Sequence, residues 1–250
     1  MKAIILSAGQ GTRLLPLTAE IPKCALTIHG KSVLEWQIDE LLKSSVDDIV
    51  VVTGFGTDKV EQLLARRYAG LQVRTVFNPF FKVSDNLATC WVVRNEMAQD
   101  FILLNGDTLF DTEVLECLLG SEPQPITVTI DKKSAYDDDD MKVILDGDRL
   151  VRIGKDIPLD MVDAESIGML LFRGAGAALF QKTIEHVLRT PEGLKRWYLS
   201  VINELAQTTT VWTCSIEGSP WAEVDFPADL EKAEAVVKGI AENWRKTGGF

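Results

Sequence analysis

The chain has 250 residues, of which 46% are hydrophobic and 25% are charged, and its formal net charge is -11. This apolar content is enough for one sizeable core and predicts a globular protein. The excess of carboxylates disfavours a nucleic-acid partner, because such binding depends on Lys and Arg that face phosphates. No apolar run approaches the roughly 20 residues that span a bilayer, so we expect no membrane partner and a cytoplasmic location.

Cysteine and histidine are too few or too dispersed to indicate a metal centre. The four cysteines form no CxxC pair, and the chain has only two histidines. Neither a structural zinc site nor a disulfide framework is indicated, and a Ser-His-Asp triad has little material to draw on. We expect the cysteines to be reduced and mostly buried.

The first half of the chain alternates strands with helices. Apolar runs typical of strands buried on both faces span residues 2–8, 48–54 and 100–107, and a further strand is predicted over 73–78. Apolar residues recur at helical spacing over 32–44 and 58–70. This alternation predicts an α/β fold with a doubly wound, mostly parallel sheet. Ligands of such sheets bind beyond the carboxyl ends of the strands, where the loop after residue 8 and Asp107 both lie.

The second half is richer in strands. The strands that we predict here span residues 126–133, 141–156, 166–173 and 208–216, with Asp146-Gly147 as a hairpin turn. Helices are predicted over 175–189, 194–206 and about 227–246. The acidic run from Asp137 to Asp140 is more typical of a solvated loop than of a metal site. With no internal repeat and no flexible linker, we predict a single domain over 1–250.

The loop after the first strand combines glycines with basic residues. The stretch from Gly9 to Arg13 has Leu14 where the dinucleotide-binding fingerprint needs a third glycine, and the Gly-Lys-Ser/Thr of a Walker A loop is absent. Two interpretations remain. One is a structural turn with solvated basic residues. The other is a turn whose backbone N–H groups face a phosphate chain, with Arg13 and Lys23 supplying positive charge.

The longer string L-x-A-G-x-G-T-R-L-x-P-L-T-x-x-x-P-K, from Leu6 to Lys23, resembles the signature of nucleotidyltransferases that activate sugar phosphates and related small phosphates. Within this superfamily the chain is more similar to cytidylyltransferases that act on phosphocholine, 2-aminoethylphosphonate or inositol phosphate. Segments 84–91, 140–157 and 165–172 carry that likeness. Glucose-1-phosphate thymidylyl- and uridylyltransferases commonly show Glu-Lys-Pro where this chain has Gly154-Lys155-Asp156, which disfavours a sugar substrate.

The resemblance implies a Rossmann-like, GT-A-like nucleotidyltransferase fold, with residues 1–120 as the nucleotide-binding half and 121–250 as the acceptor-binding half. It implies transfer of CMP from CTP to a small phosphate or phosphonate, with Mg²⁺ as cofactor and pyrophosphate as product. Asp107 and Asp225 would hold the metal, although each could instead cap a following helix. Arg13 and Lys23 would be catalytic, with Arg13 on the β- and γ-phosphates and Lys23 near the α-phosphorus. The alternative for Lys23 is an exposed surface lysine.

The resemblance also implies two sets of binding residues. The nucleotide-binding set is Leu6, Ala8, Gly9, Gln10, Gly11, Thr12, Arg13, Lys23, Asp85, Asn86, Ala88 and Asp107. Asp85 or nearby carbonyls could accept from the cytosine amino group, while Asn86 could instead cap the helix beginning at Leu87. The acceptor-binding set is Lys142, Lys155, Glu165, Trp197 and Glu223. For the two lysines an exposed strand face is the alternative, and for Glu165 it is a hydrogen-bonded structural role.

Two other functions remain open from the sequence. One is a sugar-1-phosphate nucleotidyltransferase that uses UTP, dTTP or GTP. The other is a catalytically silent nucleotide-binding module that regulates a partner. The oligomeric state is equally open, between a monomer and a homodimer.

Overall fold

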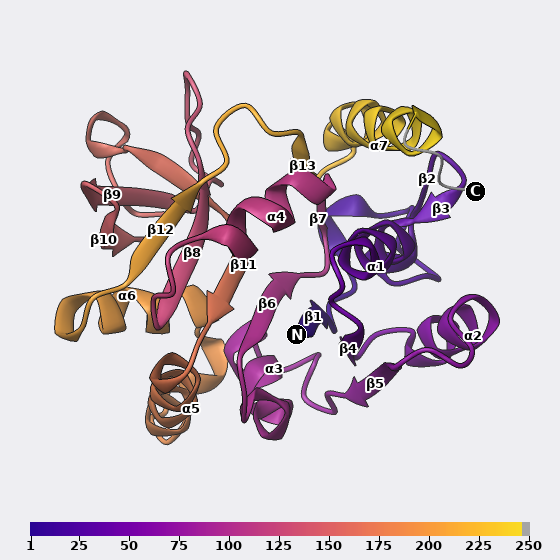
Figure 1. Ribbon diagram of the computed structural model, residues 1–250. Helices are drawn as coiled ribbons and strands as arrows, with labels where there is room; N and C mark the ends of the chain where they lie inside the picture. Colours follow the sequence, from indigo (N-terminus) through magenta and orange to yellow (C-terminus); the bar gives the residue numbers. More distant parts are fainter. Residues whose placement is uncertain (247–250) are drawn as a thin grey trace.

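The computed structural model describes residues 1–246 and contains one nine-stranded sheet with helices on both faces (Figure 1). The strand order is β5-β4-β1-β6-β11-β8-β12-β10-β9. The strands of this sheet are β1 (Lys2–Ser7), β4 (Asp48–Thr53), β5 (Val73–Phe77), β6 (Phe101–Asn105), β8 (Ile126–Asp131), β9 (Lys142–Asp146), β10 (Arg149–Ile153), β11 (Ala164–Phe172) and β12 (Trp212–Ser215). The helices are α1 (Val33–Lys43), α2 (Thr57–Arg67), α3 (Asn86–Val92), α4 (Thr112–Gly120), α5 (Ala175–Leu188), α6 (Tyr198–Thr208) and α7 (Asp229–Lys246).

Strands β5, β4, β1 and β6 form the parallel part of the sheet. Successive side chains of β1 point to opposite faces, and both faces are buried: Ile4 packs into the core below α3, α5 and α6, whereas Ala3 and Ile5 pack into the core below α1, α2 and α4. Burial on both faces explains the nearly continuous apolar runs of β1, β4 and β6. The parallel arrangement also brings the loops that follow β1 and β6 to the same edge of the sheet.

Beyond β6 the sheet becomes mixed. Strand β11 is antiparallel to both β6 and β8, while β12 runs parallel to β8. Strands β9 and β10 form the predicted hairpin, and β9 also pairs with the start of β11, so this half of the sheet curls back on itself. Gly168 interrupts the β8–β11 register with φ +71°, and a Cβ there would collide with the Asn105 side chain, so glycine is required.

Two short strands bring together segments far apart in the sequence. Strand β13 (Trp221–Glu223) pairs antiparallel with β7 (Thr108–Phe110), which follows β6 directly. Helix α7 packs over this pair and over the β2–β3 hairpin (Thr27–Ile28 and Lys31–Ser32), and its apolar residues form a third cluster with those of α1. The chain near residue 225 therefore lies beside the end of β6.

The predicted fold class is confirmed, and the differences lie mainly in element boundaries. The helix predicted over 194–206 begins at Tyr198, because Gly193–Lys195 form a separate 3₁₀ turn. The strand predicted over 208–216 shortens to Trp212–Ser215. Helix α1 begins where its sequence indicates, since Ser32 accepts from Glu35 N and the Glu35 side chain accepts from Ser32 N.

The four cysteines are free thiols, and three of them are buried, while Cys117 is exposed. No helix among residues 1–246 combines the length and the apolar character that a membrane crossing needs.

Candidate active site

A cleft of about 440 Å³ opens at the carboxyl ends of β1 and β6. It is bordered on one side by the loop after β1 and on the other by segments of the second half. Most of the predicted site residues line it: Leu6, Ala8, Gly9, Gly11, Thr12, Arg13, Lys23, Asp85, Asn86, Asp107, Lys155, Trp197, Glu223 and Asp225. Residues from the predicted nucleotide and acceptor sets thus share one cavity.

The loop after β1 is shaped so that Lys23 can cross beneath it. Gly11 adopts φ +78°, and a Cβ at this position would lie 2.8 Å from the Cβ of Lys23. The Thr18 hydroxyl donates to the Gly11 carbonyl oxygen at 2.7 Å, which ties the two limbs of the loop together. Glycine is needed here for both the backbone angle and the close approach. The interpretation of this loop as a mere solvated turn does not account for a buried lysine below it.

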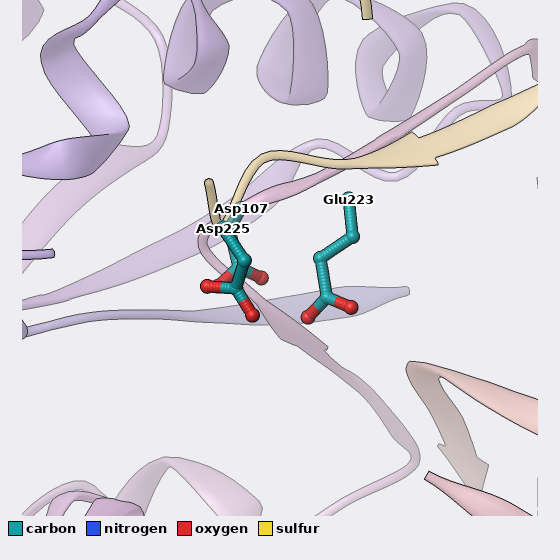
Figure 2. Close-up of side chains that lie close together, drawn as sticks. All are labelled: Asp107, Glu223 and Asp225. Carbon is teal, nitrogen blue, oxygen red and sulfur yellow. The ribbon is translucent and has the colours of Figure 1, made fainter. Parts of the chain in front are cut away.

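Three carboxylates gather at the floor of the cleft (Figure 2). Asp107 follows β6, Glu223 ends β13 and Asp225 comes two residues later, and one oxygen of each lies within 4.8 Å of the others. The Val224 N–H donates to the Asp107 carbonyl oxygen at 3.1 Å and fixes the two segments side by side. Asp107 Oδ1 is buried without a hydrogen-bond partner. Hard carboxylate oxygens crowded in this way fit a Mg²⁺ ion, which would offset their mutual repulsion.

Lys23 extends into this carboxylate cluster. Its Nζ lies 2.6 Å from Asp107 Oδ2 and also pairs with Asp225 Oδ1, and only 12% of its side chain is exposed. Burial alone would lower the pKa of this ammonium group, but the two carboxylates outweigh burial and raise its pKa above the ordinary value. Lys23 is therefore a charged, nearly buried lysine, and the alternative of a surface lysine is wrong.

The same crowding of carboxylates favours the charged form of Lys23 but disfavours the charged form of Glu223. Although Glu223 as a whole residue is exposed, desolvation of its carboxyl group by the cleft and the charges of Asp107 and Asp225 raise the pKa of this group above its ordinary value. The sequence assigned this residue to the acceptor, but the structure also places it among the predicted metal ligands. A divalent cation bound at these oxygens would favour the ionised form of all three groups.

Arg13 and Lys155 come from different parts of the chain, and both line the cleft. Arg13 Nη2 lies 2.9 Å from Asp225 Oδ2, and its guanidinium stacks 4.8 Å from the centroid of the Phe226 ring. Lys155 Nζ lies 5.4 Å from the centroid of the Trp197 ring, and 43% of Trp197 is exposed. Two separate cations that line one cavity can contact two anionic groups of its ligands.

Asp107, Asp225 and Asn86 do not cap helices with their side chains, although the sequence left that alternative open. Asp111, rather than Asp107, is the N-cap of α4. Asp229 Oδ2 accepts from the backbone N–H groups of Asp225 and Phe226. The Asp225 carboxylate instead faces the cleft, where it pairs with Lys23 and Arg13. Asn86 Oδ1 accepts from Tyr198 N at 2.9 Å, so Asn86 joins α3 to the start of α6 instead of capping its own helix.

Among the described residues that were predicted to bind substrates, four do not line the cleft: Gln10, Ala88, Lys142 and Glu165. Gln10 donates to the Thr18 carbonyl oxygen, and Ala88 is buried within α3. Lys142 and Glu165 are only 2% and 3% exposed, below the loop that links β8 to β9. The geometry does not favour direct contact of these four with a ligand.

Asp139 is a residue of the cleft that the sequence did not indicate. The acidic run was expected to be a solvated loop, yet the Asp139 carboxylate reaches the cleft and pairs with both Arg13 and Lys155. Asn105, Thr89 and Gly168 also line the cleft without having been predicted. No local pattern separates Asp139 from its three acidic neighbours, so only the tertiary structure identifies it.

The cleft brings cations and carboxylates together at the carboxyl ends of parallel strands, an arrangement that suits an enzyme acting on phosphate groups. Residues 2–140 match the family model described as nucleotidyl transferase, which covers more than half of the chain. The protein belongs to the nucleotidyl transferase family and is a nucleotidyltransferase enzyme.

Relatives and a solved structure resemble the chain over nearly its whole length. It is 26% identical over 242 residues to the choline-phosphate cytidylyltransferase of Streptococcus pneumoniae, covering 95% of this chain and 99% of that protein. It is 28% identical over 246 residues to the CMP-5'-(3-aminopropyl)phosphonate synthase of Streptomyces rubellomurinus, covering 94% of this chain and 38% of that protein. The inositol-1-phosphate CTP transferase from T. maritima superposes with a TM-score of 0.82 at 23% sequence identity, over 96% of each chain, and shows the shared fold.

Proposed function

We propose that the protein transfers CMP from CTP to a small phosphate or phosphonate, with Mg²⁺ held by Asp107 and Asp225. The observation that carries the proposal is the meeting of Lys23 with these two aspartates inside a single cleft that Arg13 also lines. The similarity of the whole chain to proteins named as cytidylyl or CMP transferring enzymes supports CTP as the donor.

The reaction consists of one displacement. An oxygen of the acceptor phosphate or phosphonate forms a bond to the α-phosphorus of CTP, and the bond from that phosphorus to the bridging oxygen breaks. Pyrophosphate leaves with the electron pair. Bound Mg²⁺ supplies positive charge at the α-phosphate. No covalent intermediate on the enzyme is required, so the protein has to align two anions and neutralise their charge.

The residues of the chain divide this work by position. Lys23, enclosed at the floor of the cleft, places its ammonium where charge develops around the α-phosphorus. Arg13 at the cleft mouth contacts the departing phosphates. Lys155 binds the acceptor phosphate, next to the exposed ring of Trp197. An exposed aromatic face beside a charged group accommodates an acceptor with a cationic head group.

The test is pyrophosphate release with a panel of nucleotides and acceptors. The nucleotides are CTP, UTP, dTTP and GTP, and the acceptors are phosphocholine, 2-aminoethylphosphonate, phosphoethanolamine, inositol phosphate and hexose phosphates. We expect turnover with CTP and one of the first four acceptors. Turnover only with another triphosphate and a hexose phosphate would replace this proposal by the sugar-1-phosphate alternative.

A further inference from the structure

The segment 132–141 between β8 and β9, called here the acidic loop, is anchored from below by buried groups. Lys142 Nζ donates to the Asp137 carbonyl oxygen at 3.0 Å. Lys133 Nζ lies 2.9 Å from both Asp140 Oδ1 and Glu165 Oε1. Lys142 and Glu165, which the sequence assigned to the acceptor, thus support this loop. A buried charge with a fixed partner holds the attached backbone in a defined position.

The loop is also ordered by its own hydrogen bonds. Asp137 Oδ1 accepts from the backbone N–H of Asp139 at 2.8 Å and from that of Asp140 at 3.1 Å. The Asp137 N–H in turn donates to Asp140 Oδ2 at 2.7 Å. These bonds form a tight turn in which Asp137 and Asp140 point into the loop. Asp139 is the member of the turn whose carboxylate is directed to the cleft.

The Asp139 carboxylate bridges two cations that belong to different parts of the fold. Its Oδ2 lies 2.7 Å from Arg13 Nη1, and its Oδ1 lies 2.6 Å from Lys155 Nζ. Burial by itself would raise the pKa of Asp139, but the ion pairs with Lys155 and Arg13 lower it below its usual range. The group is therefore an anion at neutral pH, held between the two side chains that face the phosphates in the proposed function.

We propose that Asp139 is an internal counter-ion of Arg13 and Lys155 that anionic ligands must displace, and that it thereby sets the affinity of the cleft for phosphate groups. The inference rests on the proposed function, because Arg13 and Lys155 are the cations that would contact the substrates. A phosphate oxygen and a carboxylate oxygen cannot occupy the same position on Arg13. Asp139 weakens the binding of every anion that uses these cations, and its return to them assists the release of pyrophosphate.

The experiment compares wild type with Asp139→Asn and with Asp138→Asn by calorimetric titration of inorganic tripolyphosphate in the presence of Mg²⁺. Asp138 is exposed and makes no hydrogen bond or ion pair within residues 1–246, so its variant has the same change in net charge without the contact. Each of the two half-exposed ion pairs opposes ligand binding by a factor of about 2 to 5. We expect Asp139→Asn to bind tripolyphosphate about 5- to 10-fold more tightly than wild type. For Asp138→Asn the change is expected to stay below about 2-fold.

A gain in affinity separates this role from a structural one, because damage to the loop would weaken binding. Asp139→Ala is expected to change affinity in the same direction, and the advantage of both variants should shrink as salt concentration rises. The role of Asp139 would be disproved in two cases, both of which leave the proposed function intact. In one, wild type binds tripolyphosphate and Asp139→Asn binds it no more tightly. In the other, Asp138→Asn gains as much affinity as Asp139→Asn. Failure of every protein to bind tripolyphosphate would refute the proposed function, and this inference with it.

Discussion

The two halves of the molecule build their parts of the cleft in different ways. The parallel half places its residues in loops that directly follow β1 and β6, so their positions follow from the strand ends. The curled second half instead supplies residues through a turn, a strand end and a loop held by the ion pairs of Lys133. The difference teaches that regular parallel strands define where a ligand site lies, whereas the residues that we propose to bind the acceptor depend on less regular packing.

Substitution of Lys23, which lies in the parallel half, is expected to have the largest effect on turnover. Lys23→Ala removes the ammonium group next to Asp107 and Asp225, and we expect turnover to fall by about 10³-fold, since this charge acts on the developing transition state. The measurement is the rate of pyrophosphate release. Lys238→Ala, an exposed lysine on α7, is the matched control and should keep wild-type turnover. A Lys23→Ala enzyme with turnover close to wild type would disprove the catalytic assignment.

Asp225 tests the part of the site that both halves share. Asp225→Asn removes a carboxylate charge from the cluster, and we expect about 10²-fold lower turnover with a raised requirement for Mg²⁺. Titration of activity with Mg²⁺ after chelator treatment measures both effects. Asp160→Asn, in an exposed turn, serves as the control. Unchanged Mg²⁺ dependence in Asp225→Asn would contradict its role as a ligand.

Lys155 and Lys142 both belong to the second half, and we expect one to bind the acceptor and the other to support the structure. Lys155→Ala is expected to raise the KM for the acceptor about 10-fold and to change the KM for CTP less, because Lys155 lines the acceptor side of the cleft. Lys142→Ala is expected to lower the melting temperature instead, since it leaves a cavity and an unpaired carbonyl oxygen of Asp137. The reverse pattern in the two variants would restore Lys142 as the acceptor lysine.

The smallest expected effect is a pH-dependent change in the free energy of unfolding that depends on Glu165. Burial raises the pKa of its carboxyl group from 4.5 to about 7, even though Lys133 opposes the rise. A raised acid pKa in the folded state stabilises the protein below pH 4.5, and this contribution is lost as pH rises through about 7. Between pH 5 and pH 8 we expect wild type to lose about 1–2 kcal/mol of unfolding free energy more than Glu165→Gln. Urea unfolding at the two pH values checks this, and parallel curves would refute it.

The sequence predicted the parallel half and its loop residues well because both depend on local patterns. Continuous apolar runs define β1 and β6, and the string from Leu6 to Lys23 is one continuous stretch that runs from the end of β1 into the segment after it. The position of Glu223 beside Asp107 depends on the pairing of β13 with β7, which no local pattern records. The contact of Asp139 likewise depends on Lys142 in β9 and Glu165 in β11, which hold residues of the acidic loop.

The pairing of β7 with β13 determines how the carboxylate cluster is assembled from distant parts of the chain. Asp107 and Asp225 come from segments on either side of most of the second half, and the short ladder between Trp221–Glu223 and Thr108–Phe110 joins them. Closing the long loop between these segments costs conformational entropy. A ligand that binds both aspartates would therefore favour the docked C-terminal segment over an undocked one.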